Sequence, residues 1–258
     1  MPIALLTDFG LKDSYVGVIK GVIASLSPTA QLIDLTHDIP PQDCCAARFV
    51  LLSAYRYLPA GTVCLVVVDP GVGTDRRAIA VQTAQGYLVG PDNGVLSGVL
   101  ASTPAVGAVE LLNPDYWRVA QPSATFHGRD IFAAVAAHLA NGLPLERLGP
   151  GIEPRSLRQL PVAAPVATAT GWEGVVQYID RFGNAATTIA ASVVACDSWE
   201  LTVGDVTLPG VSTYGEVDPG GGLALVGSHG FVEVAVNQGS AQKKLGLAVG
   251  DRVSISQR

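Results

Sequence analysis

Apolar runs and segments of helical period alternate along the N-terminal part of the chain. Three short runs rich in β-branched and aliphatic residues predict strands, and the segments between them carry apolar residues three and four positions apart, which predicts helices. The predicted strands cover 3–7, 31–35 and 63–68, and the predicted helices cover 14–26 and 42–57. This alternation is typical of a parallel sheet with right-handed crossovers.

Each of the three predicted strands ends in polar residues. Asp8 follows the first strand, the turn 36–38 follows the second, and Asp69 follows the third. The ends of parallel strands lie on one edge of a sheet, where ligands bind in open α/β folds. We therefore expect Asp8 and Asp69 on the same edge. A loop with two glycines then leads from Asp69 to Arg76 and Arg77.

The pattern changes towards the second half of the chain. A predicted hairpin (78–83 with 87–89), a short helix (95–100) and a longer helix (131–139) precede the segment 150–170. That segment is rich in proline and has no helical period, so we expect a linker or an edge segment there.

Short apolar runs separated by glycine-rich turns follow this segment. They predict strands at 174–179, 186–190, 201–208, 223–226, 231–236 and 252–255. Short strands with frequent turns indicate a small barrel or a sandwich. We therefore predict two domains, an α/β domain over 1–165 with a mainly parallel central sheet, and a smaller all-β domain over 166–258.

The composition narrows the classes of function. Hydrophobic residues make up 48% of the 258 residues and charged residues only 15%, which indicates a compact globule that can bury further surface in an oligomer. The net charge of -6 argues against a nucleic-acid partner or an anionic membrane, because both require a basic surface. No apolar run reaches the ~18 to 20 residues of a membrane span. The first residues lack the pattern of a signal peptide, so we expect a cytoplasmic protein.

The four cysteines are Cys44, Cys45, Cys64 and Cys196, and none of them forms a CxxC or CxxH motif. Such spacing favours buried free thiols in a reducing compartment over a zinc site or a disulfide framework. We therefore expect no metal site.

Asp69, Arg76 and His127 form the most promising chemical group. A carboxylate, a guanidinium and an imidazole together can hold and polarise a water molecule, with the histidine available as a base near neutral pH. An adjacent arginine would keep Asp69 ionised. The alternative is a structural ion pair of Asp69 with Arg76 or Arg77, together with a His127 that only caps a helix. The residues alone leave both interpretations open.

A second group lies at the first strand end and at the start of the helix that follows. Asp8 can accept two hydrogen bonds from a vicinal diol such as that of ribose, and the amides at the helix start favour anionic groups. Asp13, Ser14 and Tyr15 begin that helix. Helix capping is the simpler explanation of Asp13 or Ser14, whereas Asp8 lies too far before the helix for capping to be its only role.

Two turns in the second domain are further candidates. In the first, Phe182 could stack on a flat ring while Asp180 and Asn184 bind polar edges, but an ordinary β-turn uses the same residues. In the second, Ser228 and His229 lie between two predicted strands, a position more typical of a hairpin than of a site.

Several motifs of this chain also occur together in one known family. They are Thr7-Asp8-Phe9-Gly10, Val68-Asp69-Pro70-Gly71-Val72-Gly73-Thr74 with Arg76, Gly90-Pro91-Asp92-Asn93-Gly94, Phe126-His127-Gly128-Arg129-Asp130, the segment 180–184 and the segment 245–247. On these motifs the chain resembles the S-adenosyl-L-methionine (SAM) hydrolases, also called SAM hydroxide adenosyltransferases. These enzymes are related to fluorinating and chlorinating enzymes that act on the same substrate. The match runs in order through nearly the whole chain.

The resemblance implies an N-terminal α/β domain, a C-terminal β-barrel domain and a homotrimer. In that trimer each active site lies between the N-terminal domain of one subunit and the C-terminal domain of its neighbour. It also implies a reaction, in which water or hydroxide displaces methionine from C5′ of the ribose and gives adenosine and L-methionine. SAM is then the substrate, and no further cofactor is expected.

The resemblance also implies roles for individual residues. Asp69, Arg76 and His127 correspond to the group that activates water, and Asp8 corresponds to the ligand of the ribose diol. The other positions that match substrate-binding residues are Asp13, Ser14, Tyr15, Asp180, Phe182, Asn184, Ser228 and His229. His229 departs from the halogenating relatives, in which we expect an arginine.

Two other functions remain as alternatives. One is a SAM-dependent halogenase that forms 5′-halo-5′-deoxyadenosine, and the other is a non-catalytic module that binds SAM or adenosine. Asp69 favours hydrolysis, because a halide pocket would present backbone amides and hydroxyls with no carboxylate beside them.

Overall fold

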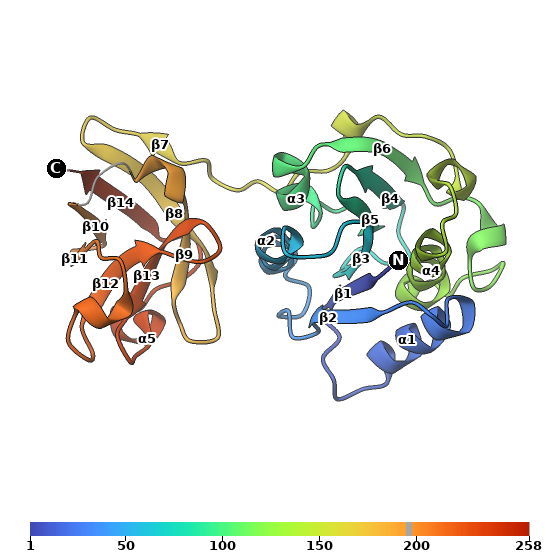
Figure 1. Cartoon of the computed structure of the whole chain (residues 1–258), viewed down its shortest axis with the longest axis horizontal. Coiled ribbons are helices and arrows are strands. Elements are labelled where there is room, and N and C mark those ends of the chain that lie inside the picture. Colours follow the sequence, from blue (N-terminus) through green and yellow to red (C-terminus); the bar gives the residue numbers. More distant parts are fainter. Residues whose placement is uncertain (195–197, 258) are drawn as a thin grey trace. The chain divides into compact units, whose positions relative to one another are not determined.

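The computed structural model describes residues 1–194 and 198–257. The chain forms two compact units, Met1–Leu160 and Pro161–Arg258 (Figure 1). Each unit has its own hydrophobic core. The first unit is an α/β fold and the second is built almost entirely of strands, as the sequence predicts.

A six-stranded sheet with the order β2-β1-β3-β5-β4-β6 forms the centre of the first unit. β1, β2, β3 and β5 run parallel, whereas β4 is antiparallel to both β5 and β6. The strands are β1 (Ile3–Thr7), β2 (Leu32–Thr36), β3 (Thr62–Val67), β4 (Ala78–Thr83), β5 (Gly86–Pro91) and β6 (Ala105–Glu110). The three predicted parallel strands and the hairpin are confirmed, while β6 was not predicted.

Helices pack against this sheet on both sides. α1 packs with α4, and α2 packs with α3 on the other side of the sheet (Figure 1). The four helices are α1 (Tyr15–Leu26), α2 (Cys44–Tyr55), α3 (Ser97–Ser102) and α4 (Ala133–Ala140). A π-helical turn, Gly128–Phe132, leads into α4, so the helix predicted at 131–139 begins earlier than expected.

The segment predicted as a linker divides into two parts. Residues 150–160 belong to the first unit, where the N–H of Arg158 donates to Asp92 (2.8 Å) and the N–H of Ile152 donates to the carbonyl of Ala108 (2.9 Å). Of the two predicted alternatives, this part is an edge segment and not a linker, because its backbone pairs with β6, with a bridge between Val109 and Gly151. Further on, β7 (Val166–Ala167) pairs with β8 as an edge strand.

The second unit is an antiparallel sheet with the order β11-β10-β14-β8-β9-β13-β12. An isolated bridge between Gly210 and Ala224 joins the region of β11 to β12, so the sheet is nearly closed around its core. The remaining strands are β8 (Gly171–Ile179), β9 (Ala185–Ala190), β10 (Trp199–Val203), β11 (Val206–Pro209), β12 (Gly222–Val226), β13 (Phe231–Val236) and β14 (Arg252–Gln257). A barrel-like sheet is thus observed.

One local prediction in this unit is wrong, and one element was not predicted. The run 201–208 is a hairpin and not one strand, because Gly204 takes a left-handed conformation (φ 55°) that turns the chain between β10 and β11. The short helix α5 (Ala241–Leu245) was not predicted.

The cysteines only partly follow the prediction of buried thiols. Cys64 is fully buried, and burial raises the pKa of its thiol to about 12. Cys44 is half-buried, and Cys45 is exposed because α2 turns it towards solvent. Cys196 lies outside the described residues. Among the helices of the described chain, none is long and apolar enough to cross a membrane.

Candidate active site

The carboxyl ends of β1 and β3 open into a cavity of about 570 Å3 in the first unit. Because β1 and β3 are adjacent and parallel, Asp8 and Asp69 emerge on the same edge, as predicted. The cavity is lined by Asp8, Phe9, Tyr15, Pro41, Gln42, Val67, Asp69, Pro70, Val72, Ser123, Thr125, Phe126, His127, Gly128 and Arg129.

Asp69 and Arg76 form a buried ion pair at the wall of this cavity. Arg76 Nε donates to Asp69 Oδ1 (3.0 Å) and Arg76 Nη2 donates to Oδ2 (2.5 Å), which is the bidentate geometry of strong arginine–carboxylate pairs. Only 6% of the Asp69 side chain and 8% of the Arg76 side chain are exposed. Arg77 turns away and pairs with Asp92, so Asp69 has the partner that the family spacing indicated.

A glycine allows the loop between these two residues to pack closely. Gly73 has a φ of 78°, and a Cβ at this position would lie 2.2 Å from the carbonyl oxygen of Ala124. The loop after Asp69 therefore rests on the segment that leads to His127, and a side chain at position 73 would separate the two segments.

His127 completes the group from the π-helical turn before α4. Its Nδ1 lies 2.8 Å from Arg76 Nη2. A guanidinium has no acceptor, so Nδ1 accepts this hydrogen bond and the neutral ring carries its proton on Nε2. Burial lowers the pKa of His127, and the charge of Arg76 lowers it further, while Asp69 and Asp130 act in the opposite direction. We therefore describe His127 as a neutral imidazole with an N–H donor.

Asp8 is held in place by a residue that sequence reasoning missed. The backbone N–H of Gln42 donates to Asp8 Oδ2 (2.8 Å), and Gln42 has a positive φ of 69°. Such a conformation is uncommon for a residue other than glycine and often marks a functional or strained loop. The sequence around Gln42 does not indicate this backbone conformation.

Aromatic rings form another part of the cavity, and of these only Tyr15 was predicted as a site residue. Phe9, Tyr15 and Phe126 contact one another, with ring centroids 5.3 to 5.9 Å apart. The guanidinium of Arg129 lies 5.2 Å from the centre of the Phe126 ring. Phe9 and Phe126 directly follow or precede the predicted residues Asp8 and His127 and belong to the same family motifs, which are the signal that could have suggested them.

The remaining predicted residues of the first unit differ in their position. Tyr15 lines the cavity, whereas Asp13 and Ser14 are exposed and are not among its lining residues. Ser14 occupies the N-cap position of α1, but its side chain makes no capping hydrogen bond.

In the second unit, Asp180 organises a tight turn. Its Oδ1 accepts the backbone N–H groups of Phe182 and Asn184, each at 2.9 Å. Phe182 projects outwards with 75% of its surface exposed. The ordinary turn that the sequence left open is therefore present, and it displays an aromatic ring on the surface.

The second predicted turn lies between β12 and β13. Ser228 is exposed, and His229 Nε2 lies 3.0 Å from Oε2 of Glu233. The backbone N–H of Phe231 donates to His229 Nδ1 (3.2 Å). The imidazole is thus bound on both nitrogens within its own unit.

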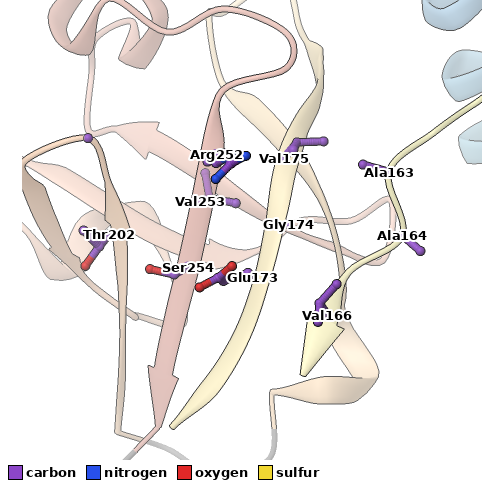
Figure 2. A pocket seen from close by; sticks show the side chains of 11 residues that line it. Ala163, Ala164, Val166, Glu173, Gly174, Val175, Thr202, Arg252, Val253 and Ser254 are labelled. Atoms are coloured by element: carbon purple, nitrogen blue, oxygen red, sulfur yellow. The ribbon is translucent and has the colours of Figure 1, made fainter. Parts of the chain in front are cut away.

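A separate cavity of about 430 Å3 lies on the outer face of the second unit (Figure 2). Glu173 of β8 and Arg252 and Ser254 of β14 line it, together with Thr202 of β10. None of the residues singled out from the sequence lines this cavity. In the described part of the chain, no group of three histidine, cysteine, aspartate or glutamate residues is arranged to hold a metal ion.

Two family models match the chain. The SAM hydroxide adenosyltransferase N-terminal domain matches residues 3–149, and the corresponding C-terminal domain matches residues 174–254. The chain belongs to the SAM hydroxide adenosyltransferase family. The motifs quoted from the sequence therefore indicated the correct family.

Individual members of the family are similar along their full length. An (R)-S-adenosyl-L-methionine hydrolase of Salinispora tropica is 47% identical, over 98% of this chain and 97% of that protein. A hydrolase of the same name from Thermus thermophilus is 46% identical, over 98% and 99%. The crystal structure of an uncharacterized conserved protein from Thermotoga maritima is 41% identical, with a TM-score of 0.93 over 99% of this chain and all of that one.

Fluorinases are more distant members of this group of enzymes. A fluorinase of Actinopolyspora mzabensis is 27% identical over 98% of this chain and 96% of that protein. The sequence is thus much nearer to the hydrolases than to this halogenating relative.

Proposed function

We propose that this protein hydrolyses SAM, with water or hydroxide attacking C5′ of the ribose to give adenosine and L-methionine. One observation carries the proposal, namely the contact of Asp69, Arg76 and His127 at the cavity wall. It occurs in a chain that is 46 to 47% identical to proteins named as SAM hydrolases.

The hydrogen bonds of this group suggest how it would treat a water molecule. The neutral His127 presents an N–H, so it can donate to the lone pair of a water or a hydroxide. Oδ2 of Asp69 accepts both Nε and Nη2 of Arg76, whereas Oδ1 accepts Nε alone and keeps a lone pair, so the carboxylate can accept a water O–H through Oδ1. His127 would then orient the nucleophile as a donor, and Asp69, rather than the histidine, would accept the hydrogen bond of the proton that leaves.

The proposed reaction requires little more from the protein, because the leaving group takes the electron pair of the broken bond. The bond from oxygen to C5′ forms while the bond from C5′ to sulfur breaks, and the electron pair stays on sulfur as a neutral thioether. Because the sulfonium leaves readily, the protein has mainly to align the nucleophile and exclude bulk water. We therefore propose that SAM is the only small molecule required and that dialysis against a chelator leaves the activity intact.

The residues of the first unit fit a nucleoside. We propose that Asp8, which lines the cavity, accepts the ribose diol, and the rings of Phe9, Tyr15 and Phe126 give the cavity an apolar wall. We propose that Asp180, Phe182, Asn184, Ser228 and His229 bind the remaining parts of SAM, as the family resemblance implies.

We further propose that the protein is a cytoplasmic homotrimer with active sites between subunits. Light scattering tests the trimer, and mixing two variants, each impaired in a different domain, tests the shared site. Asp69→Asn and Ser228→Ala subunits, combined by refolding together, should regain part of the activity. A monomer that turns over SAM would contradict this assembly.

The reaction is tested by incubating the purified protein with SAM and separating the products by chromatography. Adenosine and methionine in equal amounts are expected, and their absence at both neutral and alkaline pH would exclude the proposal. Chloride or fluoride in the same assay distinguishes a halogenase, because that enzyme would form 5′-halo-5′-deoxyadenosine. A chain that binds adenosine without turnover would be the non-catalytic module.

A further inference from the structure

A buried glutamate in the second unit binds two side chains, one from the proposed substrate-binding turn and one, Tyr214, that has no role in the proposed function. Glu233 of β13 is only 5% exposed. Its Oε1 accepts the hydroxyl of Tyr214 (2.8 Å), and its Oε2 faces His229 Nε2 (3.0 Å). A buried carboxylate is costly unless it is hydrogen-bonded, so these two donors account for its presence.

The contacts of His229 fix its tautomer. Its Nδ1 accepts the backbone N–H of Phe231, so this nitrogen carries no proton, and the proton of the neutral ring is on Nε2, directed at Glu233. Gly227 leaves the space for this ring. A Cβ at that position would lie 2.6 Å from His229 Nε2 and 3.0 Å from Glu233 Oε2.

Tyr214 brings a second segment of the chain to the same glutamate. It begins the short 3-10 helix Tyr214–Glu216, which is anchored by a capping box between Thr213 and Glu216. Burial raises the pKa of Tyr214 to about 12, and the nearby carboxylates of Glu233 and Asp180 add to the effect. The hydroxyl therefore keeps its proton and donates to Glu233. Asp180 is close enough to act on this tyrosine, so the two predicted turns of the second unit share one electrostatic environment.

We propose that Glu233 and Tyr214 are positioning residues for the SAM-binding turn 227–230. They hold His229 as the Nε2–H tautomer, and the turn thereby presents Ser228 and its backbone to the substrate in one fixed geometry. The His229 side chain acts inwards, as an anchor of the turn, so His229 contributes to the proposed substrate-binding surface through its backbone. This inference rests on the proposed function, in which Ser228 and His229 belong to the substrate-binding surface.

Steady-state kinetics with SAM tests the proposal through two variants. In Glu233→Gln the amide offers one acceptor to two donors, so one hydrogen bond to a charged group is lost. That loss corresponds to a rise in KM of roughly 10- to 150-fold. Tyr214→Phe removes one donor to the same carboxylate and should also raise KM by roughly 10- to 150-fold. In both variants kcat should change by less than about threefold, because the group proposed to act on water lies in the first unit.

Glu216→Gln is the matched control. It makes the same substitution at the end of the short 3-10 helix that Tyr214 begins, and the remaining side-chain oxygen can still accept the N–H groups of Ser212 and Thr213. Its KM should stay within about twofold of the wild-type value. An equal rise in KM for Glu216→Gln and Glu233→Gln would overturn the proposal, because general disturbance of the loop would then explain both.

Nitrogen NMR of the imidazole gives a readout that does not depend on turnover. The chain has four histidines, so single His→Gln variants can assign the signals. We expect the Nε2–H tautomer for His229 in the wild type and a mixture of tautomers in Glu233→Gln. An unchanged tautomer together with an unchanged KM would refute the positioning role. If the wild type does not cleave SAM, the proposed function fails, while the NMR result still decides whether Glu233 orients His229.

Discussion

Replacing Arg76 with lysine tests whether the bidentate geometry of the Arg76–Asp69 pair, and not only the positive charge, is needed for activity. Lysine keeps the positive charge near Asp69, but its single ammonium cannot reproduce the planar fork that binds both carboxylate oxygens. It also cannot bind Asp69 in this way and donate to His127 at the same time. The substitution should therefore weaken the ion pair without abolishing it, and Asp69 and His127 should lose their fixed orientation.

The size of the effect follows from the contacts. Arg76 donates to Asp69 Oδ1 at 3.0 Å, to Asp69 Oδ2 at 2.5 Å and to His127 Nδ1 at 2.8 Å. Lysine can retain one of these three. Two lost hydrogen bonds to or from charged groups amount to about 3 to 6 kcal/mol if they act fully on the transition state. Allowing for relaxation, we expect the lower half of that range, which is a fall in kcat of about 100- to 2000-fold.

Arg77→Lys is the matched control for this measurement. Arg77 is the next residue in the chain and also pairs with a buried carboxylate, Asp92, but it is not among the residues that line the described cavity. We expect its kcat to stay within about threefold of the wild-type value. Steady-state SAM cleavage and thermal unfolding should be measured for both variants. Similar kcat values for Arg76→Lys and Arg77→Lys, at similar unfolding temperatures, would refute the assignment of Arg76 to the reaction.

Three further outcomes are expected. Because the pKa of His127 is lowered, the ring stays neutral down to a pH below its ordinary pKa of about 6.5, and the acid limb of the kcat/KM profile should fall below pH 6.5. An acid limb above pH 7 would contradict this. Gly73→Ala should lower the free energy of unfolding by about 1 to 3 kcal/mol more than Gly142→Ala, measured by denaturant titration. Gly142 has a similar φ of 89° but nothing within 4 Å of its added Cβ. Asp8→Asn should weaken adenosine binding by about 10-fold or more in calorimetry, whereas Asp38→Asn should not change it.

The arrangement of the strand ends could be predicted from the sequence because it depends on local patterns and on one general rule. Apolar runs located β1 and β3, and the parallel order placed Asp8 and Asp69 on one edge. The strand pattern could not identify the partner of Asp69, because Arg76 and Arg77 are adjacent residues of the same type. Only the family spacing favoured Arg76, and the structure shows the reason, because Arg77 is bound to Asp92.

The features that were missed depend on contacts between distant segments. Gln42 binds Asp8 through a backbone conformation that its side chain does not indicate. Phe126 contacts Phe9 because α4 packs beside α1, which is a contact between distant segments of the chain. In the second unit, the turn at Gly204 was missed because its flanking residues favour strands. Local propensity cannot resolve such cases, since tertiary contacts decide them.

The Asp69–Arg76 pair presents its carboxylate, and not its guanidinium, to the cavity, and this arrangement favours water over a halide as the nucleophile. Asp69 lines the cavity, while Arg76 lies behind it and is not among the lining residues of the described cavity. A halide beside Asp69 would meet a negative charge first. At about 4 Å and an effective dielectric constant near 20, that repulsion is about 4 kcal/mol before the opposite charge of Arg76 is counted. Water meets an acceptor in Asp69 and a donor in His127, and its own O–H groups and lone pairs satisfy both. The same ion pair with the guanidinium outermost would favour an anion, so the position of the carboxylate supports the proposed hydrolysis over halogenation.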